Sequence, residues 1–211
     1  MRLSERTNSQ FGSGVRSLQE LSLNVLDVAQ NSIRAGAKLI EIRISRFVSK
    51  NQMTIEIKDN GCGMTKEQVQ KVENPFFTTR TTRSVGLGVP LFKMSAEMTG
   101  GHFSIESEVG QGTLVTAFYV LDHIDLMPLG DMASTMVTLI SMNPELDFSY
   151  TYQTDTDGFC LDTREVRKIL EGIPLSSPQV MEFVREFIAE NTAQADSESE
   201  RLAHLENKDG A

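Results

Sequence analysis

Two stretches of the chain alternate apolar and polar residues, the pattern of β-strands with one buried face. In residues 39–47, isoleucines recur at every second position from Ile40 to Ile44, and residues 53–57 alternate in the same way. A polar run, residues 49–52, lies between them. Side chains of a strand point alternately to the two faces of a sheet, and strands joined by a short polar loop form a hairpin. This pattern predicts an antiparallel pair with one apolar face.

Helical periodicity and a second alternating pair surround this hairpin. The expected elements in chain order are a helix over 18–34, the first hairpin, a short helix after a capping box at Thr65–Gln68, a helix over 87–99 and a second hairpin over 102–120. This order predicts an α/β (α+β) fold. We expect a two-layer sandwich in which helices cover one face of a mixed, mainly antiparallel sheet.

The pattern changes after residue 121. Residues 1–121 are expected to form one unit, and residues 122–193, which contain further helix and strand patterns, a small C-terminal α/β appendage. Residues 194–211 are highly charged and lack aromatic side chains. Such a composition buries little apolar surface, so this segment is expected to be disordered.

Charge and cysteine content exclude several classes of protein. The net charge of -9 argues against a nucleic-acid partner, which usually requires a basic face. Cys62 and Cys160 form no CxxC pair, so we expect a reducing compartment and no disulfide framework. No apolar run approaches the ~18 residues of a membrane span, and the first residues are polar. We therefore expect a cytoplasmic protein without a membrane partner.

The first predicted helix carries three polar residues on one face. Asp27, Asn31 and Arg34 are spaced i, i+4 and i+7. The Asn31 carboxamide is a suitable oxygen ligand for Mg²⁺, Asp27 can accept or orient a proton, and Arg34 can neutralise phosphate charge. The alternative is a solvated helix face with an Asn31–Arg34 contact.

A second carboxylate ends the first predicted hairpin. Asp59 is followed by Gly61 and Gly63, which allow the backbone to turn tightly. Such a carboxylate can accept a hydrogen bond from the exocyclic amine of adenine. The alternative is an ordinary Asp-Asn-Gly turn.

Two further glycine elements follow. Gly86 and Gly88 precede the start of a helix, where backbone N–H groups can bind phosphate oxygens. Residues 74–86 before them lack periodicity and contain several Thr and Arg residues, as in a functional loop. Gly112 and Thr113 lie at the second hairpin turn. The usual phosphate loop, Gly-x4-Gly-Lys-Ser/Thr, is absent from the sequence.

Together, these four elements resemble the N, G1, G2 and G3 elements of the GHKL ATPase superfamily. The resemblance spans about residues 18–120 and is greatest to histidine-kinase catalytic domains, because of Pro75-Phe-Phe-Thr-Thr-Arg80. It implies ATP and Mg²⁺ as cofactors and a separate protein as phosphoacceptor or partner in signal transduction. The sequence leaves a homodimer open.

The resemblance also implies individual roles. Asn31 would bind Mg²⁺, Asp59 would recognise adenine, and residues 74–86 would form a lid. The other implied nucleotide-binding residues are Gly61, Gly63, Met64, Thr79, Arg80, Gly86, Leu87, Gly88 and Thr113, and the implied catalytic residues are Asp27 and Arg34.

Three departures from the family pattern leave the reaction open. Ser84 replaces a common first glycine of G2, and Asp27 stands where hydrolytic members carry Glu and sensor kinases commonly carry Asn. The few residues before residue 18 are expected to contain no phosphoacceptor module. We therefore expect a phosphotransferase that acts in trans. The alternatives are an ATP-gated interaction module with slow ATPase activity and an anti-sigma-type serine kinase.

Overall fold

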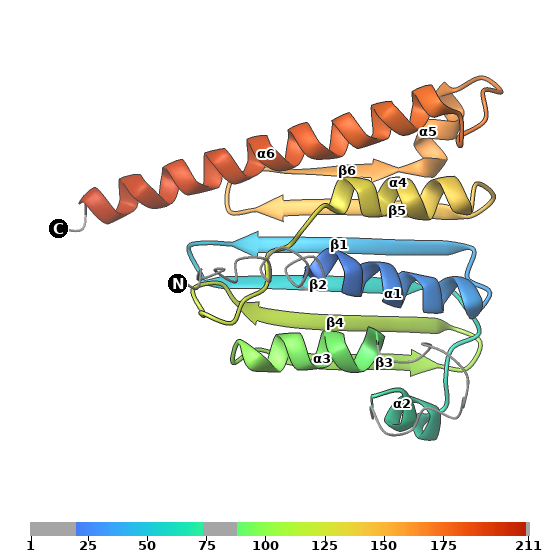
Figure 1. Cartoon of the computed structure of the whole chain (residues 1–211), viewed down its shortest axis with the longest axis horizontal. Coiled ribbons are helices and arrows are strands. Elements are labelled where there is room, and N and C mark those ends of the chain that lie inside the picture. Colours follow the sequence, from blue (N-terminus) through green and yellow to red (C-terminus); the bar gives the residue numbers. More distant parts are fainter. Residues whose placement is uncertain (1–19, 74–87, 210–211) are drawn as a thin grey trace, which may run out of the picture.

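The computed structural model describes residues 20–73 and 88–209 (Figure 1). Its helices are α1 (Leu21–Arg34), α2 (Lys66–Val72), α3 (Gly88–Met98), α4 (Met132–Met142), α5 (Thr163–Ile169) and α6 (Pro178–Asp209). Its strands are β1 (Leu39–Phe47), β2 (Gln52–Asp59), β3 (His102–Glu108), β4 (Gly112–Val120), β5 (Asp147–Thr154) and β6 (Gly158–Asp162). Both predicted hairpins form, and the Thr65–Gln68 capping box starts α2.

The six strands form one mixed sheet in the order β3-β4-β2-β1-β5-β6. Every neighbouring pair is antiparallel except β1 and β5, which are parallel. Helices α1, α3, α4 and α6 cover one side of this sheet (Figure 1). The predicted two-layer sandwich with a mainly antiparallel sheet is confirmed.

The core lies between the sheet and its helical layer. Alternate residues of each central strand are buried on the helix side, as Ile40, Ile42 and Ile44 are in β1. The largest fully buried side chains include Phe92 of α3 and Tyr119 of β4. Burial of this apolar surface supplies most of the stabilising free energy, at about 25 cal/mol for each Å² removed from water.

The segment after residue 121 joins the same sheet and also supports α1. Its strand β5 pairs with residues 39–46 of β1, so β1 is a central strand. The N-cap residue Glu20 makes no side-chain capping bond. Instead, the backbone N–H groups of Leu21 and Ser22 donate to the carbonyl oxygens of Pro128 and Leu129, over 3.0 and 2.8 Å. Helix termini need such partners. The division into a unit over 1–121 and an appendage over 122–193 stays a prediction.

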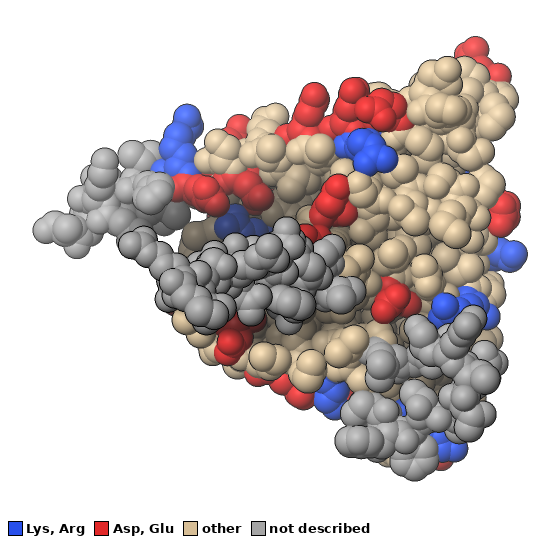
Figure 2. Space-filling view, viewed as in Figure 1, with Lys and Arg blue, Asp and Glu red and all other residues tan. Residues whose placement is uncertain are grey.

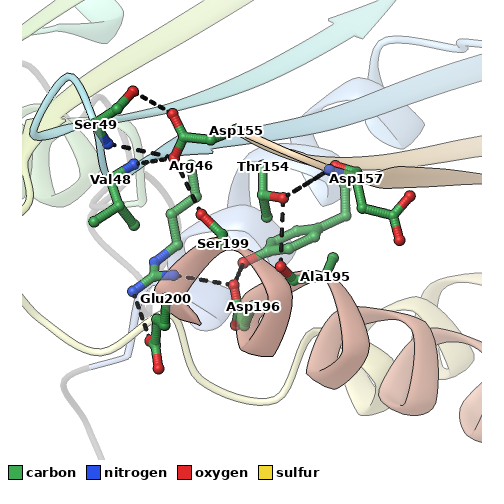
Figure 3. A network of polar contacts seen from close by, with 11 residues as sticks. Arg46, Val48, Ser49, Thr154, Asp155, Asp157, Ala195, Asp196, Ser199 and Glu200 are labelled. Atoms are coloured by element: carbon green, nitrogen blue, oxygen red, sulfur yellow. Dashed lines mark hydrogen bonds and ion pairs between the residues drawn. The ribbon is translucent and has the colours of Figure 1, made fainter. Parts of the chain in front are cut away.

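The expectation of disorder from residue 194 was wrong for residues 194–209, which continue helix α6. The composition rule failed because this part of α6 docks through polar contacts (Figure 3). Asp196 accepts hydrogen bonds from Arg46 of β1 and from the hydroxyl of Tyr152, over 3.1 and 2.6 Å. Ala195 and Ser199 on the same side of the helix are each 1% exposed.

A second part of this network centres on Asp155, in the turn between β5 and β6 (Figure 3). Its carboxylate accepts bonds from the backbone N–H of Val48, over 2.6 Å, from Ser49, and from the Ser199 hydroxyl of α6, over 3.1 Å. Burial raises the pKa of Asp155, but the hydrogen bonds from Ser49, Ser199 and Val48 together hold this pKa below its usual value. Asp155 thus joins two turns and α6.

We expect Asp155→Asn to lower the free energy of unfolding by about 1–2 kcal/mol at neutral pH, because the bonds to a charged acceptor are weakened. A carboxyl whose pKa is depressed in the folded state stabilises the fold above the unfolded-state pKa of about 3.9. That contribution is lost as the pH falls from there through the folded-state pKa. Urea unfolding over a pH series should therefore show the difference from wild type narrowing in acid.

The matched control is Glu186→Gln, at an exposed position on α6. A difference between Asp155→Asn and wild type that stayed constant from neutral to acidic pH would contradict this role of the carboxylate.

Candidate functional site

Asp59, the last residue of β2, has a buried carboxylate that is held on both oxygens. It is 7% exposed. The Ser32 hydroxyl of α1 donates to Oδ2 over 2.6 Å, and the backbone N–H of Gly61 donates to Oδ1 over 2.8 Å. An ionised carboxylate offers about four lone-pair sites, so each oxygen retains capacity for another donor. Asp59 is therefore a fixed acceptor, and each of its oxygens can accept a further hydrogen bond.

The turn after β2 packs closely against the β3–β4 hairpin, and only glycine fits at two positions. Gly63 has φ +65°, and a Cβ there would lie 1.9 Å from the carbonyl oxygen of Glu108. Gly112 has φ +107°, and its Cβ would lie 2.0 Å from the carbonyl oxygen of Asp59. Positive φ and such backbone contact both exclude larger residues. These glycines let the two turns meet beside Asp59.

Ser107 of β3 connects the turn after β2 to β4. Its hydroxyl accepts a hydrogen bond from the backbone N–H of Met64 over 2.9 Å and lies 2.8 Å from the hydroxyl of Thr113. Thr113 is also the strand neighbour of Asp59. Asp59 and Met64 of one predicted motif and Thr113 of another are therefore brought together.

Backbone contacts tie this turn to the end of α1. The Asn60 side-chain oxygen accepts bonds from the N–H groups of Lys38 and Leu39, over 2.8 and 2.9 Å. The N–H of Cys62 donates to the carbonyl oxygen of Ala35 over 2.9 Å. These bonds fix the position of α1 relative to β2, so that Ser32 reaches Asp59.

Asn31 and Arg34 lie exposed on α1 and contact each other. The Arg34 guanidinium donates to the side-chain oxygen of Asn31 over 2.8 Å. This is the contact expected if the residues form only a solvated helix face. The same oxygen is the atom predicted to bind Mg²⁺, and it has a second lone pair.

Asp27 lies against the first residue of α3. A Cβ on Gly88 would approach the Cβ of Asp27 to 2.6 Å and its Oδ2 to 3.2 Å. The glycine therefore permits the carboxylate to lie beside the start of α3. A negative charge is stabilised there by the helix dipole.

Several predicted positions lie outside the described residues. They are Thr79, Arg80, Gly86 and Leu87, together with the proposed lid over 74–86. Among the side chains that the structure describes, no group of three or more His, Cys, Asp or Glu is arranged to hold a metal. No helix of the described chain is long and apolar enough to cross a membrane.

Sequence reasoning missed Ser32, Ser107 and Asn60, which orient the site. Ser32 could have been found from the sequence, because it falls at the helical spacing of the buried residues Leu21, Val25 and Val28. A polar side chain on such a buried face needs a hydrogen-bond partner. The roles of Ser107 and Asn60 depend on contacts between turns, for which the sequence has no periodic signal.

Comparison with known proteins identifies the family. The family described as "Histidine kinase-, DNA gyrase B-, and HSP90-like ATPase" matches residues 15–123, just over half of the chain. The chain belongs to this family. The matched range is a GHKL ATP-binding domain, and all the site residues above lie within it.

The curated relatives include a bacterial sensor protein and several bacterial histidine or sporulation kinases. A putative sensor protein of Shewanella frigidimarina is 30% identical over 109 residues, 51% of this chain and 16% of that protein. Sporulation kinase C of Bacillus subtilis is 30% identical over 97 residues, 46% of this chain and 22% of that protein. The histidine-protein kinase AtoS of Escherichia coli is 35% identical over 100 residues, 47% of this chain and 16% of that protein. The matches thus span less than a quarter of each relative.

Among solved structures, the Aquifex aeolicus MutL ATPase domain complexed with ADP is 19% identical and has a TM-score of 0.42. The match covers 73% of this chain and 70% of that one.

We expect Ser32→Ala to reduce the free energy of unfolding by about 1–3 kcal/mol in the absence of nucleotide, because a buried carboxylate oxygen loses its donor. Urea denaturation measures the change. The exposed Ser197→Ala on α6 is the control and should lie within about 0.5 kcal/mol of wild type. Equal effects of the two substitutions would show that the Ser32–Asp59 bond contributes nothing.

Proposed function

We propose that this protein binds ATP with Mg²⁺ and transfers the γ-phosphoryl group to a separate protein in signal transduction. The observation that carries the proposal is the buried Asp59 carboxylate, which the Ser32 hydroxyl and the Gly61 N–H hold in place. Membership of an ATPase family supports nucleotide binding, and the kinase relatives support transfer.

Asp59 would recognise the adenine base. The exocyclic amine of adenine is a donor and suits a carboxylate acceptor, whereas guanine has a carbonyl oxygen at the corresponding position. A site built to accept a hydrogen bond rejects the analogue without the donor, because the buried acceptor is then left unpaired. Gly61 and Gly63 would let the backbone approach the base, and Met64 and Thr113 would lie beside it.

Asn31 and Arg34 would act at the phosphates. Mg²⁺ binds few protein ligands and completes its octahedron with waters and phosphate oxygens, so one carboxamide oxygen is enough to anchor it. The Arg34–Asn31 hydrogen bond places a positive charge next to the proposed metal ligand. When nucleotide binds, Arg34 would turn towards the phosphates. Gly86, Leu87 and Gly88, with Thr79 and Arg80, would contribute the remaining phosphate contacts.

Asp27 would orient the attacking group. Its position against Gly88 puts a carboxylate beside the start of α3, near the proposed phosphate site. Phosphoryl transfer needs chiefly positioning and charge stabilisation from the protein. A carboxylate one turn from Asn31 can accept the proton of a water or of an acceptor hydroxyl or imidazole. We place this activity in the cytoplasm, where free cysteines such as Cys62 stay reduced.

We expect Asp59→Asn to weaken ATP binding by about 10- to 100-fold, because a charged acceptor is replaced by a neutral amide. The preference for ATP over GTP should narrow at the same time. The Asn side chain can turn either its oxygen towards the adenine amine or its amide N–H group towards the guanine carbonyl oxygen. Isothermal titration calorimetry with each nucleotide and Mg²⁺ measures both changes.

The control is Asp125→Asn, in the loop after β4, where the side chain is 51% exposed. Unchanged affinity for ATP in the folded Asp59→Asn protein would exclude Asp59 as the residue that recognises adenine.

We expect Asp27→Asn to bind ATP within about threefold of wild type and to lose about 10²- to 10⁴-fold in the rate of phosphoryl transfer or hydrolysis, the usual contribution of a general base. Transfer of label from radioactive ATP to candidate acceptor proteins, and release of phosphate, give the two rates. Glu97→Gln, exposed on α3, is the control.

The stability of the labelled product in acid separates the proposed reaction from its alternatives. Phosphohistidine is lost in acid, whereas phosphoserine survives, as an anti-sigma-type serine kinase requires. Slow phosphate release without any labelled acceptor would favour an ATP-gated interaction module.

Turnover that is unchanged in Asp27→Asn would remove Asp27 from the mechanism.

A further inference from the structure

Strand β6 is an outer strand of the sheet, and no described strand pairs with its free side. At the β5–β6 turn, the N–H of Thr154 donates to the carbonyl oxygen of Asp157 over 2.8 Å. Antiparallel pairs alternate between bonded and non-bonded positions. The alternation therefore points the backbone N–H and C=O groups of Gly158, Cys160 and Asp162 away from β5. The N–H of Gly158 donates to the Asp157 carboxylate over 2.7 Å, so the remaining groups of these three residues form the open edge.

The sequence of β6 itself lacks the usual protection against strand pairing, while α6 packs against this strand. Natural sheets guard their edges with charged residues, proline, bulges or a covering element. The opposite outer strand, β3, carries Glu106 and Glu108, and α2 lies against it (Figure 1). In contrast, β6 has the sequence Gly-Phe-Cys-Leu-Asp, with a single charge at its end and no proline.

The edge is complementary to itself in the antiparallel direction. Pairing about a two-fold axis at Cys160 sets Gly158 of each copy opposite Asp162 of the other, so no two like charges face each other. The flanking residues do not oppose this pairing. In this register, Asp157 of one copy lies opposite Thr163 of the other, and the Arg164 guanidinium donates to the Asp162 carboxylate of its own chain. Parallel pairing would instead place Asp157 of one copy beside Asp157 of the other.

Apolar surface continues from this edge onto α6. The ring of Phe159 in β6 packs edge-on against Phe187, with centroids 5.7 Å apart, and Phe187 contacts Phe183 at 6.0 Å. Phe183 is 56% exposed. A large aromatic side chain that remains half exposed next to an open strand edge is a surface that a partner can bury.

The outer face of α6 does not offer a second surface of this kind. Glu182, Glu186 and Glu190 recur along it at every fourth position and are exposed, and Figure 2 shows acidic side chains along this helix. Two copies packed through this face would bring like charges together. This repulsion disfavours self-association through the outer face of α6 and leaves the β6 edge as the surface for it.

We propose that two copies of this chain associate through β6, in antiparallel pairing about Cys160, and form one continuous sheet across the dimer. The interface is isologous, as closed two-fold dimers require. Strands β1 and β5 separate β6 from β2, which carries Asp59. The interface thus leaves the proposed nucleotide site open in both copies.

Introduction of a charge at Cys160 gives the sharpest test. The side chain is exposed, so it can be replaced without disturbing the β5–β6 ladder. In the dimer, the two residues at this position face each other, and like charges directly opposite each other are destabilising. We expect Cys160→Lys and Cys160→Glu each to weaken dimerisation roughly tenfold, and an equimolar mixture of the two to recover it as a heterodimer. Sedimentation velocity over a concentration series measures these equilibria. Recovery in the mixture shows that neither variant is misfolded.

Oxidative cross-linking gives a second, independent readout. Directly opposed residues in a hydrogen-bonded antiparallel pair have Cα atoms about 5.5 Å apart, within the range of about 4.4–6.8 Å that a disulfide spans. Mild oxidation with copper phenanthroline should join the subunits of wild-type protein and of Cys62→Ser, but not those of Cys160→Ser.

Wild-type protein that remains monomeric at its highest soluble concentration would overturn the proposal. A dimer that neither charged variant weakens, or one that cross-links only through Cys62, would overturn it as well. Calorimetry with ATP on the same variants separates this result from the proposed function. Loss of the dimer with unchanged ATP affinity supports the β6 interface, whereas absence of ATP binding in wild type concerns only the nucleotide site.

Discussion

The hydrogen bond between the Ser32 hydroxyl and the Asp59 carboxylate joins the two elements on which the site depends. It connects the first helix of the domain to the end of the central strand β2 across a separation of 27 residues. The bond is buried, so it is stronger than in water, and loss of either partner would leave a desolvated polar group. Because Asn31 precedes Ser32, the same contact that orients Asp59 also sets the position of the proposed metal ligand.

Two other sets of contacts show that the C-terminal half supports this arrangement. The carbonyl groups of Pro128 and Leu129 accept the first N–H groups of α1, and β5 covers the flank of β1. Helix α6 then docks through Asp196 and Ser199 onto the strands and turns at the end of the sheet that lies away from Asp59. The C-terminal half thereby adds β5 and β6 to the sheet of the nucleotide-binding domain. Strand β6 is the outer strand, and no described strand pairs with its outer side.

Much of the fold could be predicted because its signals are local. Alternation in β1 and β2 and the capping box at Thr65 depend on neighbouring residues, and each formed as expected. The disorder predicted from residue 194 failed for the opposite reason. Composition counts apolar residues, whereas this part of α6 is held by Arg46, Tyr152 and Asp155, which are distant in sequence. In the site, Asp59 and its glycines were found from their spacing, but Ser107 and Asn60 act only across turns that the fold brings together.

The sequence by itself determined the order of the elements, the alternation that buries one face of the sheet, and the residue types that suit a nucleotide: a helix-borne carboxamide, a strand-end carboxylate and glycines where φ is positive. Only the tertiary structure decided which groups meet. It placed Gly88 against Asp27, joined Met64 to Thr113 through Ser107, and inserted β5 beside β1. The physical reason is that periodicity and propensity act over a few residues. The partners of buried polar groups are chosen by packing between segments that are far apart along the chain.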